Sequence, residues 1–275
     1  MPGTILIMMF FLFGTVESTG VPDTGTGPGA VSSATVLTTA CEQDPAALIV
    51  QGRGLLAEGV NRRERDRIEQ AREVFEQLMA AGDNAQLGHY YLGLAGYRLA
   101  NLGPEEDRRT IRRHINAAID HLETAVELDP DSAESLALLG GAYGIKIAVY
   151  PLTAMTLGPK NQRVRERARE LAPDNPRVVL LDAISYFNTP GAFGGDKEKA
   201  LELALHSADL FTAEEVDDPR LPRWGREEVW AWIGIIQTDA GRDEEARAAY
   251  ERALEINPDY SWVRDVLLPD LPPGT

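Results

Sequence analysis

The feature that most limits how this chain can fold is a pattern near its C-terminus. Small residues, one tyrosine and two helix-ending residues occur there at the spacing of a helical hairpin. Gly234 lies on one predicted helix that ends at Gly241, and Ala246 and Tyr250 lie one turn apart on the next, which ends at Pro258. Small side chains let two antiparallel helices cross closely, and the tyrosine ring fills the space beside them. This segment therefore predicts a helical hairpin.

The same arrangement recurs toward the N-terminus at intervals of about 34 residues. One earlier second helix carries Ala118, Leu122 and Ala125 before Pro130, and its first helix carries Leu92-Gly93. Five hairpins are predicted, at about residues 44–82, 84–130, 132–174, 176–212 and 226–258, with a short capping helix at 259–268. The chain is predicted to be all-α.

The last hairpin resembles the tetratricopeptide repeat (TPR) consensus at nearly every signature position. The matching residues are Trp230, Ile233-Gly234, Ala246, Tyr250, Ala253 and Pro258. The resemblance implies a right-handed superhelical stack of about five irregular TPR-like hairpins, an α-solenoid. It also implies a binding scaffold rather than an enzyme.

The repeats depart from the consensus in their connections. Insertions are predicted at 59–65, 101–110 and 188–195, and a Pro-containing connection at 212–226. In the third hairpin we expect an extended first helix, from Ile145 to Thr156, interrupted by Pro151. The domain organisation is predicted as a signal-like segment and disordered linker at 1–43, the repeat domain at 44–268 and a disordered tail at 269–275.

The N-terminal segment is typical of an exported protein. Ile5 to Phe13 is an apolar run, too short to span a bilayer but of the length of a signal-peptide core. Residues 38–41, Thr-Thr-Ala-Cys, resemble a bacterial lipoprotein acylation site, which makes Cys41 a candidate for lipidation. We expect a periplasmic or envelope-anchored protein. The alternatives are a cytoplasmic location and an ordinary role for Cys41 before the first helix.

The charge of the chain is negative and uneven. The net charge is −16, which disfavours binding to nucleic acid or to anionic membranes in general because phosphates are repelled. Residues 170–275 hold 22 acidic and 10 basic side chains, a net charge of −12. This acidic part fits either a basic partner or a need for solubility.

The residues that usually carry chemistry do not form a recognisable constellation. With one cysteine, the chain cannot form an internal disulfide or a thiolate metal cluster. His114 and His121 share a helix face but lack a Glu-x-x-His or His-x-x-x-His partner. Gly194-Gly195-Asp196 is interpreted as a turn with a helix cap. We predict no catalytic residue, metal or cofactor.

Three arginine clusters, each at the start of a predicted second helix, allow two interpretations. Their members are Arg62, Arg63, Arg65 and Arg67; Arg108, Arg109, Arg112 and Arg113; and Arg163, Arg165, Arg167 and Arg169. They form a basic stripe for an acidic partner, or they are solvated helix faces with local ion pairs to the acidic residues between them.

The TPR resemblance implies where a partner binds, because first helices line the concave surface of a TPR stack. The consensus groove positions give Arg53, Tyr90, Leu94, Tyr97, Arg98, Ile145, Arg177, Phe187, Asn188, Thr238 and Asp239. This mixture of aromatic, aliphatic and arginine side chains suits a peptide or partner helix of unknown identity. The alternative is that irregular helices close the groove and these residues belong to the core.

A second, more limited resemblance concerns residues 188–200, Asn-Thr-Pro-Gly-Ala-Phe-Gly-Gly-Asp-Lys-Glu-Lys-Ala. This segment resembles the periplasmic TPR component of TRAP-type transporters over roughly residues 110–212. That resemblance implies an alternative function, an exported accessory protein that binds a small apolar ligand and docks to the solute-binding protein of a transporter.

Overall fold

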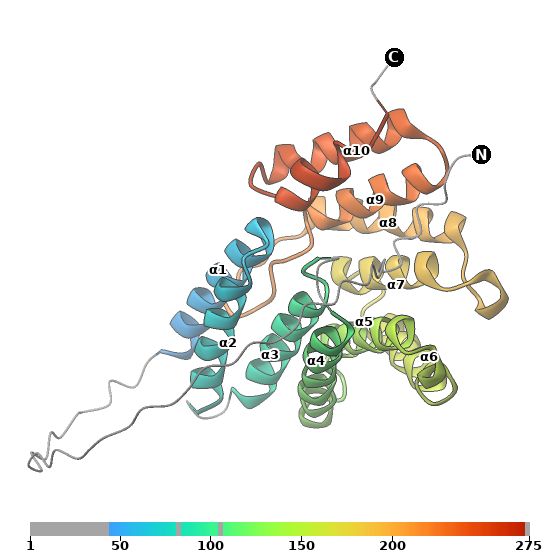
Figure 1. Cartoon of the computed structure of the whole chain (residues 1–275). Helices are drawn as coiled ribbons and strands as arrows, with labels where there is room; N and C mark the ends of the chain where they lie inside the picture. Colours follow the sequence, from blue (N-terminus) through green and yellow to red (C-terminus); the bar gives the residue numbers. More distant parts are fainter. Residues whose placement is uncertain (1–43, 81–83, 104–106, 273–275) are drawn as a thin grey trace, which may run out of the picture.

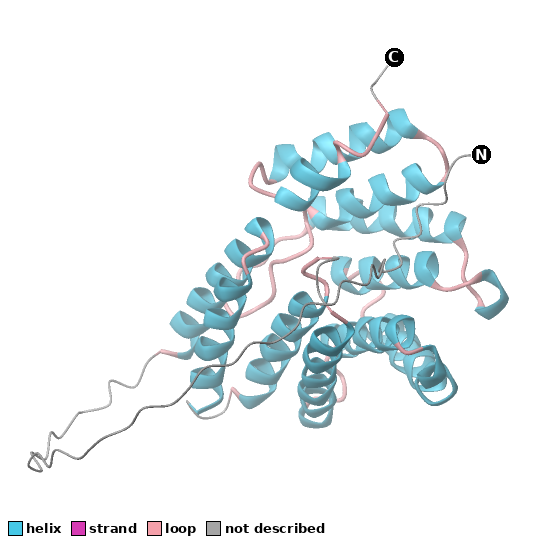
Figure 2. Ribbon diagram, viewed as in Figure 1, coloured by secondary structure: helices cyan, strands magenta, loops and turns pink. Residues whose placement is uncertain are grey.

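The computed structural model describes residues 44–80, 84–103 and 107–272. The described residues form ten α-helices and contain no strand (Figure 2). Ile5 to Phe13, the linker and Cys41 lie outside the described residues, as does the end of the predicted tail. None of the described helices is both long and apolar enough to cross a membrane.

The helices pack as five antiparallel hairpins that follow one another along a curved stack (Figure 1). The hairpins are α1 (Pro45–Arg62) with α2 (Arg65–Ala80), α3 (Ala85–Ala100) with α4 (Arg108–Leu128), α5 (Ala133–Val149) with α6 (Ala154–Leu171), α7 (Pro176–Asn188) with α8 (Lys197–Ala213), and α9 (Glu228–Asp239) with α10 (Asp243–Ile256). This confirms the predicted all-α repeat solenoid. A π-helical turn, Val263–Leu267, covers the last hairpin where a capping helix was predicted.

Polar caps fix where several helices begin. The side chains of Asp107 and Asp196 accept backbone N–H groups of α4 and α8, at 2.8 and 2.9 Å. Asn175 does the same for α7, which begins at Pro176, a residue suited to the first helical turn. The turn between α9 and α10 uses Gly241 at φ 71°, a conformation that glycine adopts without strain.

Close helix crossings explain the small residues of the repeat. A Cβ atom on Gly234 would lie 2.2 Å from the ring of Tyr250, as the sequence pattern predicts. The first hairpin uses the same device, since a Cβ on Gly52 would lie 2.4 Å from the ring of Phe75. In both hairpins a large side chain of the second helix thus packs directly on the backbone of the first helix.

The third hairpin differs from the prediction. The first helix ends at Val149 rather than continuing to Thr156, and a 3₁₀ turn at Pro151–Thr153 leads into α6. The cause is Pro151, which disfavours the helical conformation in the residue before it; that residue, Tyr150, has φ −130° and ψ 78°. The predicted insertion at 59–65 is also shorter in the structure, because α1 continues to Arg62.

The crossing in the last hairpin can be tested by adding one methyl group. Gly234→Ala should lower the free energy of unfolding by about 1–3 kcal/mol, because the added carbon overlaps the ring of Tyr250. The control is Gly54→Ala on α1, where no atom lies within 4 Å of the new carbon. That control should be neutral or stabilise the protein by up to about 1 kcal/mol. Urea unfolding measures both, and equal stabilities would contradict the proposed packing.

Candidate functional site

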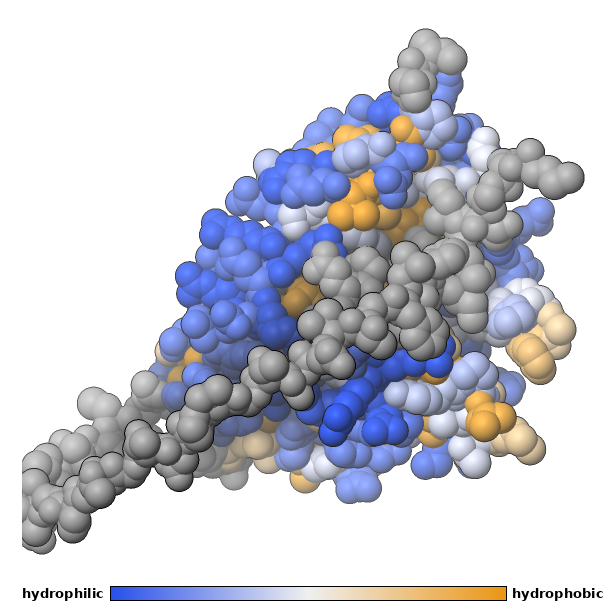
Figure 3. Space-filling model, in the orientation of Figure 1, coloured by the Kyte–Doolittle hydropathy of each residue, from blue (hydrophilic) through white to orange (hydrophobic). Residues whose placement is uncertain are grey.

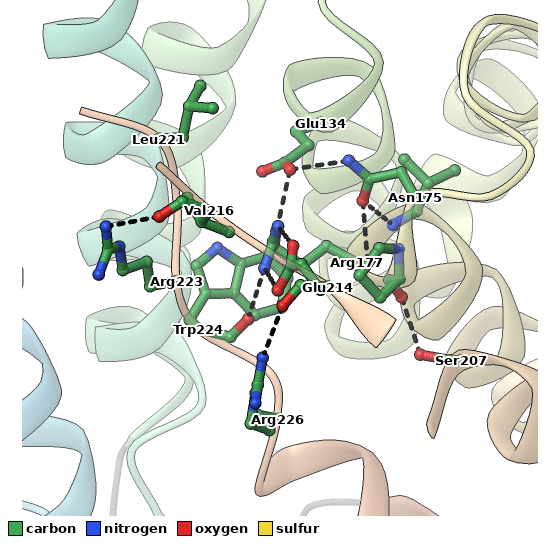
Figure 4. A network of polar contacts seen from close by, with 12 residues as sticks. Glu134, Asn175, Arg177, Ser207, Glu214, Val216, Leu221, Arg223, Trp224 and Arg226 are labelled. Carbon is green, nitrogen blue, oxygen red and sulfur yellow. Dashed lines mark hydrogen bonds and ion pairs between the residues drawn. The ribbon is translucent and has the colours of Figure 1, made fainter. Parts of the chain in front are cut away.

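The connection between α8 and α9 crosses the face formed by the first helices of the hairpins. We call residues 214–227 the strap. Figure 4 shows its middle and its end beside Arg177 and Glu134. Arg53 on α1 donates a hydrogen bond to the carbonyl oxygen of Leu221, and Tyr91 on α3 donates one to that of Arg220 at 2.7 Å. The strap thus binds to the stack partly through its backbone, as a bound peptide would.

Trp224 is the tryptophan of the strap, and its side chain packs against the first helices of the hairpins. Its Nε1–H donates to the hydroxyl of Tyr90 at 2.9 Å, and that hydroxyl donates to Glu134 at 3.1 Å. The guanidinium of Arg98 lies 4.9 Å from the centre of an indole ring. Burial raises the pKa of Tyr90 well above its usual value, so its hydroxyl remains protonated and able to donate.

Arg177 on α7 forms the centre of the polar network drawn in Figure 4. Its side chain is only 4% exposed, and its Nε donates to Glu134 at 2.9 Å. Its Nη2 forms an ion pair with Glu214, and its Nη1 donates to the carbonyl oxygen of Trp224 at 3.3 Å. Burial alone would lower the pKa of Arg177, but the two carboxylates raise it above its usual value. The guanidinium is therefore charged and links α5, α7 and the strap.

A second buried ion pair fixes the end of the strap. Arg98 on α3 donates two hydrogen bonds to the carboxylate of Glu228, the first residue of α9, at 2.9 and 2.6 Å. The two side chains are 13% and 8% exposed. The bidentate geometry suits a buried pair, in which the hydrogen bonds offset the loss of solvation. The second hairpin is thereby joined to the fifth.

The structure brings together six of the predicted groove residues and buries four of them, while Arg53 and Arg98 remain partly exposed. They are Arg53, Tyr90, Leu94, Tyr97, Arg98 and Arg177. Tyr90, Leu94 and Tyr97 are 2%, 1% and 8% exposed. Over the first hairpins the strap occupies the predicted groove where it contacts Arg53, Tyr90, Arg98 and Arg177. Leu94 and Tyr97 lie in the hydrophobic core. Repeat geometry gives the direction of these side chains but not the path of a later connection, so their role in binding a partner stays a prediction.

The other predicted groove residues lie outside the direct contacts of the strap. Ile145 and Phe187 are partly exposed, and Asn188 is exposed. Thr238 donates to the carbonyl oxygen of Gly234 at 2.9 Å. Asp239 forms an ion pair with Lys197 at 2.6 Å, which joins the fifth hairpin to the start of α8.

An aromatic row extends from Phe187 to two tryptophans that were not among the predicted site residues. We use the name aromatic row for Phe187, Trp232 and Trp262. The ring centres of Phe187 and Trp232 lie 6.2 Å apart, and those of Trp232 and Trp262 lie 6.3 Å apart, both edge to face. All three side chains are partly exposed. Phe187 was a predicted groove residue, whereas Trp232 and Trp262 lie outside the consensus groove set, so only their large aromatic side chains could have pointed to them.

The histidines form a pair rather than a metal site in the described residues. The Nδ1 atoms of His89 and His121 lie 3.1 Å apart, and burial lowers the pKa of both rings. His114, which shares a face with His121, lies beside Arg65 instead, at 2.9 Å. No cluster of three or more His, Cys, Asp or Glu able to hold a metal occurs among the residues that the structure describes.

The arginine clusters form ion pairs, but mostly with acidic residues outside the clusters. Arg67 lies 3.8 Å from Glu64, which is a pair of the expected local kind. Arg62 pairs instead with Glu58 at 3.1 Å, and Arg165 and Arg169 both pair with the buried Asp182 on α7. A cleft of about 650 Å³ lies between the turn joining α1 to α2 and the C-terminal helical turn. Its lining is charged and includes Arg62, Arg63, Arg65, Asp259, Arg264 and Asp265. Such a lining does not suit an apolar ligand.

Taken together, the stacked hairpins and the face of first helices define an all-α helical-repeat protein. The family model described as "Tetratricopeptide repeat" matches residues 227–260, the last hairpin. The last hairpin is a tetratricopeptide repeat, and the hairpins before it stack as the repeats of such a fold do. No match was found among curated proteins.

Two solved structures are similar to the chain over most of its length. The HusA haemophore from Porphyromonas gingivalis is 25% identical, with a TM-score of 0.59, and the match covers 73% of this chain and 96% of that one. A thermophilic TPR protein from Thermus thermophilus is 21% identical, with a TM-score of 0.55, and the match covers 82% and 96% of the two chains. The second likeness confirms the TPR fold.

The buried pair at the end of the strap gives a stability test. Arg98→Ala should lower the free energy of unfolding by about 3–5 kcal/mol, because it leaves the carboxylate of Glu228 buried without its partner. The control is Arg220→Ala, which breaks an exposed ion pair with Asp218 and should change stability by less than about 1 kcal/mol. Chemical denaturation checks both, and similar losses for the two variants would contradict this account of the strap.

Proposed function

We propose that the protein is a non-enzymatic scaffold that binds a protein or peptide partner through the aromatic row and its polar surroundings. The TPR fold supports a role in protein–protein interaction, and the partial exposure of the row is the observation that supports this location. Several groove positions over the first hairpins are occupied by the strap, whereas Phe187 on α7, Trp232 on α9 and Trp262 after α10 retain exposed area.

The chemistry of this surface suits an apolar anchor within a polar rim. Tryptophan and other large aromatics dominate the energetic centres of protein interfaces, because they bury much area for few rotatable bonds. Lys197 lies 5.6 Å from the ring centre of Phe187 and pairs with Asp239. The exposed amide of Asn188 adds a further polar group near the row. A partner helix or peptide with aliphatic or aromatic side chains fits such a surface.

Partner capture tests the proposal. The chain is immobilised, partners are captured from the native cell and identified by mass, and their affinity is measured for the wild type and for Trp262→Ala. Loss of an anchoring indole should weaken binding at least tenfold, which corresponds to about 1.4 kcal/mol.

Two controls keep this experiment interpretable. Phe193→Ala removes an aromatic ring that is 82% exposed and lies outside the row, so it should leave the affinity unchanged. A melting curve for Trp262→Ala shows whether the variant remains folded, because part of this side chain packs on the C-terminal core. A folded variant that binds the same partners with unchanged affinity would rule out the aromatic row.

A second candidate function is the binding of a small apolar ligand, and the likeness to a haemophore favours it. A flat tetrapyrrole could stack on Trp232 and Trp262, whose rings offer apolar faces. Titration with haemin should then give a saturable shift of its absorption band, weakened in Trp232→Ala. Haemin that shows only the spectrum of free or non-specifically bound pigment would remove this candidate.

Export and membrane anchoring remain proposals that the sequence supports. The support is the apolar run from Ile5 to Phe13 and the acylation-like segment that ends at Cys41. Docking to the solute-binding protein of a transporter is likewise a proposal, based on the resemblance of residues 188–200. The alternative is a cytoplasmic TPR scaffold.

A further inference from the structure

Two neighbouring turns carry the most exposed large apolar side chains among the described residues. Leu152, in the turn between α5 and α6, and Met155, in the first turn of α6, are 90% and 87% exposed. Phe193, in the turn between α7 and α8, is 82% exposed. None of these side chains takes part in the strap or in the aromatic row. A single exposed apolar side chain is ordinary at a protein surface, so the informative observation is that three such side chains lie on adjacent hairpins.

The two turns lie on the same edge of the stack. Each joins the first helix of a hairpin to its second, and α5 packs against α7, so the turns of these adjacent hairpins project in the same direction. Figure 3 shows hydrophobic side chains standing out at the edge of the molecule beyond α6 and α7, as these are placed in Figure 1. We call this the projecting edge and define it by Leu152, Met155 and Phe193.

Basic side chains lie next to the projecting edge. Tyr150, two residues before Leu152, donates a hydrogen bond to the carbonyl oxygen of Arg108 at 3.0 Å, and the guanidinium of Arg112 lies 5.8 Å from its ring centre. Arg109 and Arg112 are exposed on the first turns of α4. The described acidic groups here are Asp107, which caps α4, Glu123, which lies 3.7 Å from Lys160, and Asp196 and Glu198 at the start of α8, next to Lys197 and Lys199. The first turns of α4 thus bring several cations beside an apolar tip.

We propose that the projecting edge docks onto an anionic lipid bilayer. Leu152, Met155 and Phe193 insert among the upper acyl chains, while the arginines of α4 lie at the level of the headgroup phosphates. Two observations favour a membrane over a protein partner. The apolar groups stand singly on narrow turns, which a deformable medium accommodates, whereas anchors in protein interfaces are flat or clustered patches. The cations beside them match the charge of the headgroups.

The negative net charge of the chain does not oppose this orientation. Most of the excess acidic charge lies in residues 170–275, a part of the chain that contributes only Phe193 to the edge. Leu152, Met155 and the arginines of α4 precede it. Exposed charges farther apart than about 8 Å are largely screened at physiological ionic strength. The local charge at the edge therefore decides the attraction at contact.

Flotation with vesicles of defined composition tests the proposal. The full chain, with Cys41→Ala to exclude acylation, is mixed with vesicles of phosphatidylcholine alone or mixed with phosphatidylglycerol. We expect binding to the anionic vesicles that falls as salt is added. The double variant Leu152→Asp/Met155→Asp should bind at least tenfold more weakly and should fold normally, because both side chains are almost fully exposed.

Matched variants separate the contributions. Leu128→Asp, at the other end of α4 and 53% exposed, should bind as the parent chain does. Arg109→Ser/Arg112→Ser should reduce binding to anionic vesicles and abolish its salt dependence. All variants keep the apolar run at Ile5–Phe13, so differences between them report on the edge alone.

Three outcomes would overturn the proposal. The first is a parent chain that does not float with either kind of vesicle. The second is undiminished binding by Leu152→Asp/Met155→Asp, which would assign any binding to the N-terminal run. The third is that Leu152→Asp/Met155→Asp floats with the vesicles as the parent chain does but no longer binds a protein partner or a second copy of itself. None of these results would decide whether a partner binds at the aromatic row, because that proposal is tested with Trp262→Ala.

Discussion

The arrangement of the molecule depends on one buried positive charge. The guanidinium of Arg177 lies inside the stack, where an unpaired charge would be strongly destabilising. It is compensated by Glu134 from the preceding hairpin and by Glu214 from the strap, so neither partner can move away without leaving a buried charge behind. The path of residues 214–227 follows from this requirement, and with it the position of Trp224 against Tyr90.

The parts of the fold that depend on local spacing could be predicted from the sequence. The hairpins were predicted because Gly234 and Tyr250 belong to one repeat and contact each other within it. The boundary in the third hairpin was wrong because Pro151 acts on the residue before it, and the helical pattern beyond it begins a new helix. In each case the deciding interaction spans few residues, so the sequence pattern contains it.

The candidate site was less predictable because its interactions join distant parts of the chain. Arg98 and Glu228 are 130 residues apart in sequence, and no local pattern relates them. The consensus groove positions correctly indicate side chains that share a face, but they assume that nothing else occupies it. Trp232 lies between consensus groove positions, and Trp262 lies just before the C-terminal helical turn. The contacts of Trp232 with Phe187 and Trp262 depend on how α7, α9 and this C-terminal segment pack together, which no local sequence pattern contains.

The strap also changes what kind of repeat protein this is. An open array behaves as a one-dimensional stack in which each repeat contacts its neighbours, so units can be gained or lost at an end. Here contacts from α1 and α3 reach a connection that follows the fourth hairpin. The number of repeats is therefore fixed by the contacts of the strap. Deleting a hairpin would shift the strap relative to the first helices that it contacts. Such a chain should evolve by reshaping its turns and surfaces rather than by changing its length.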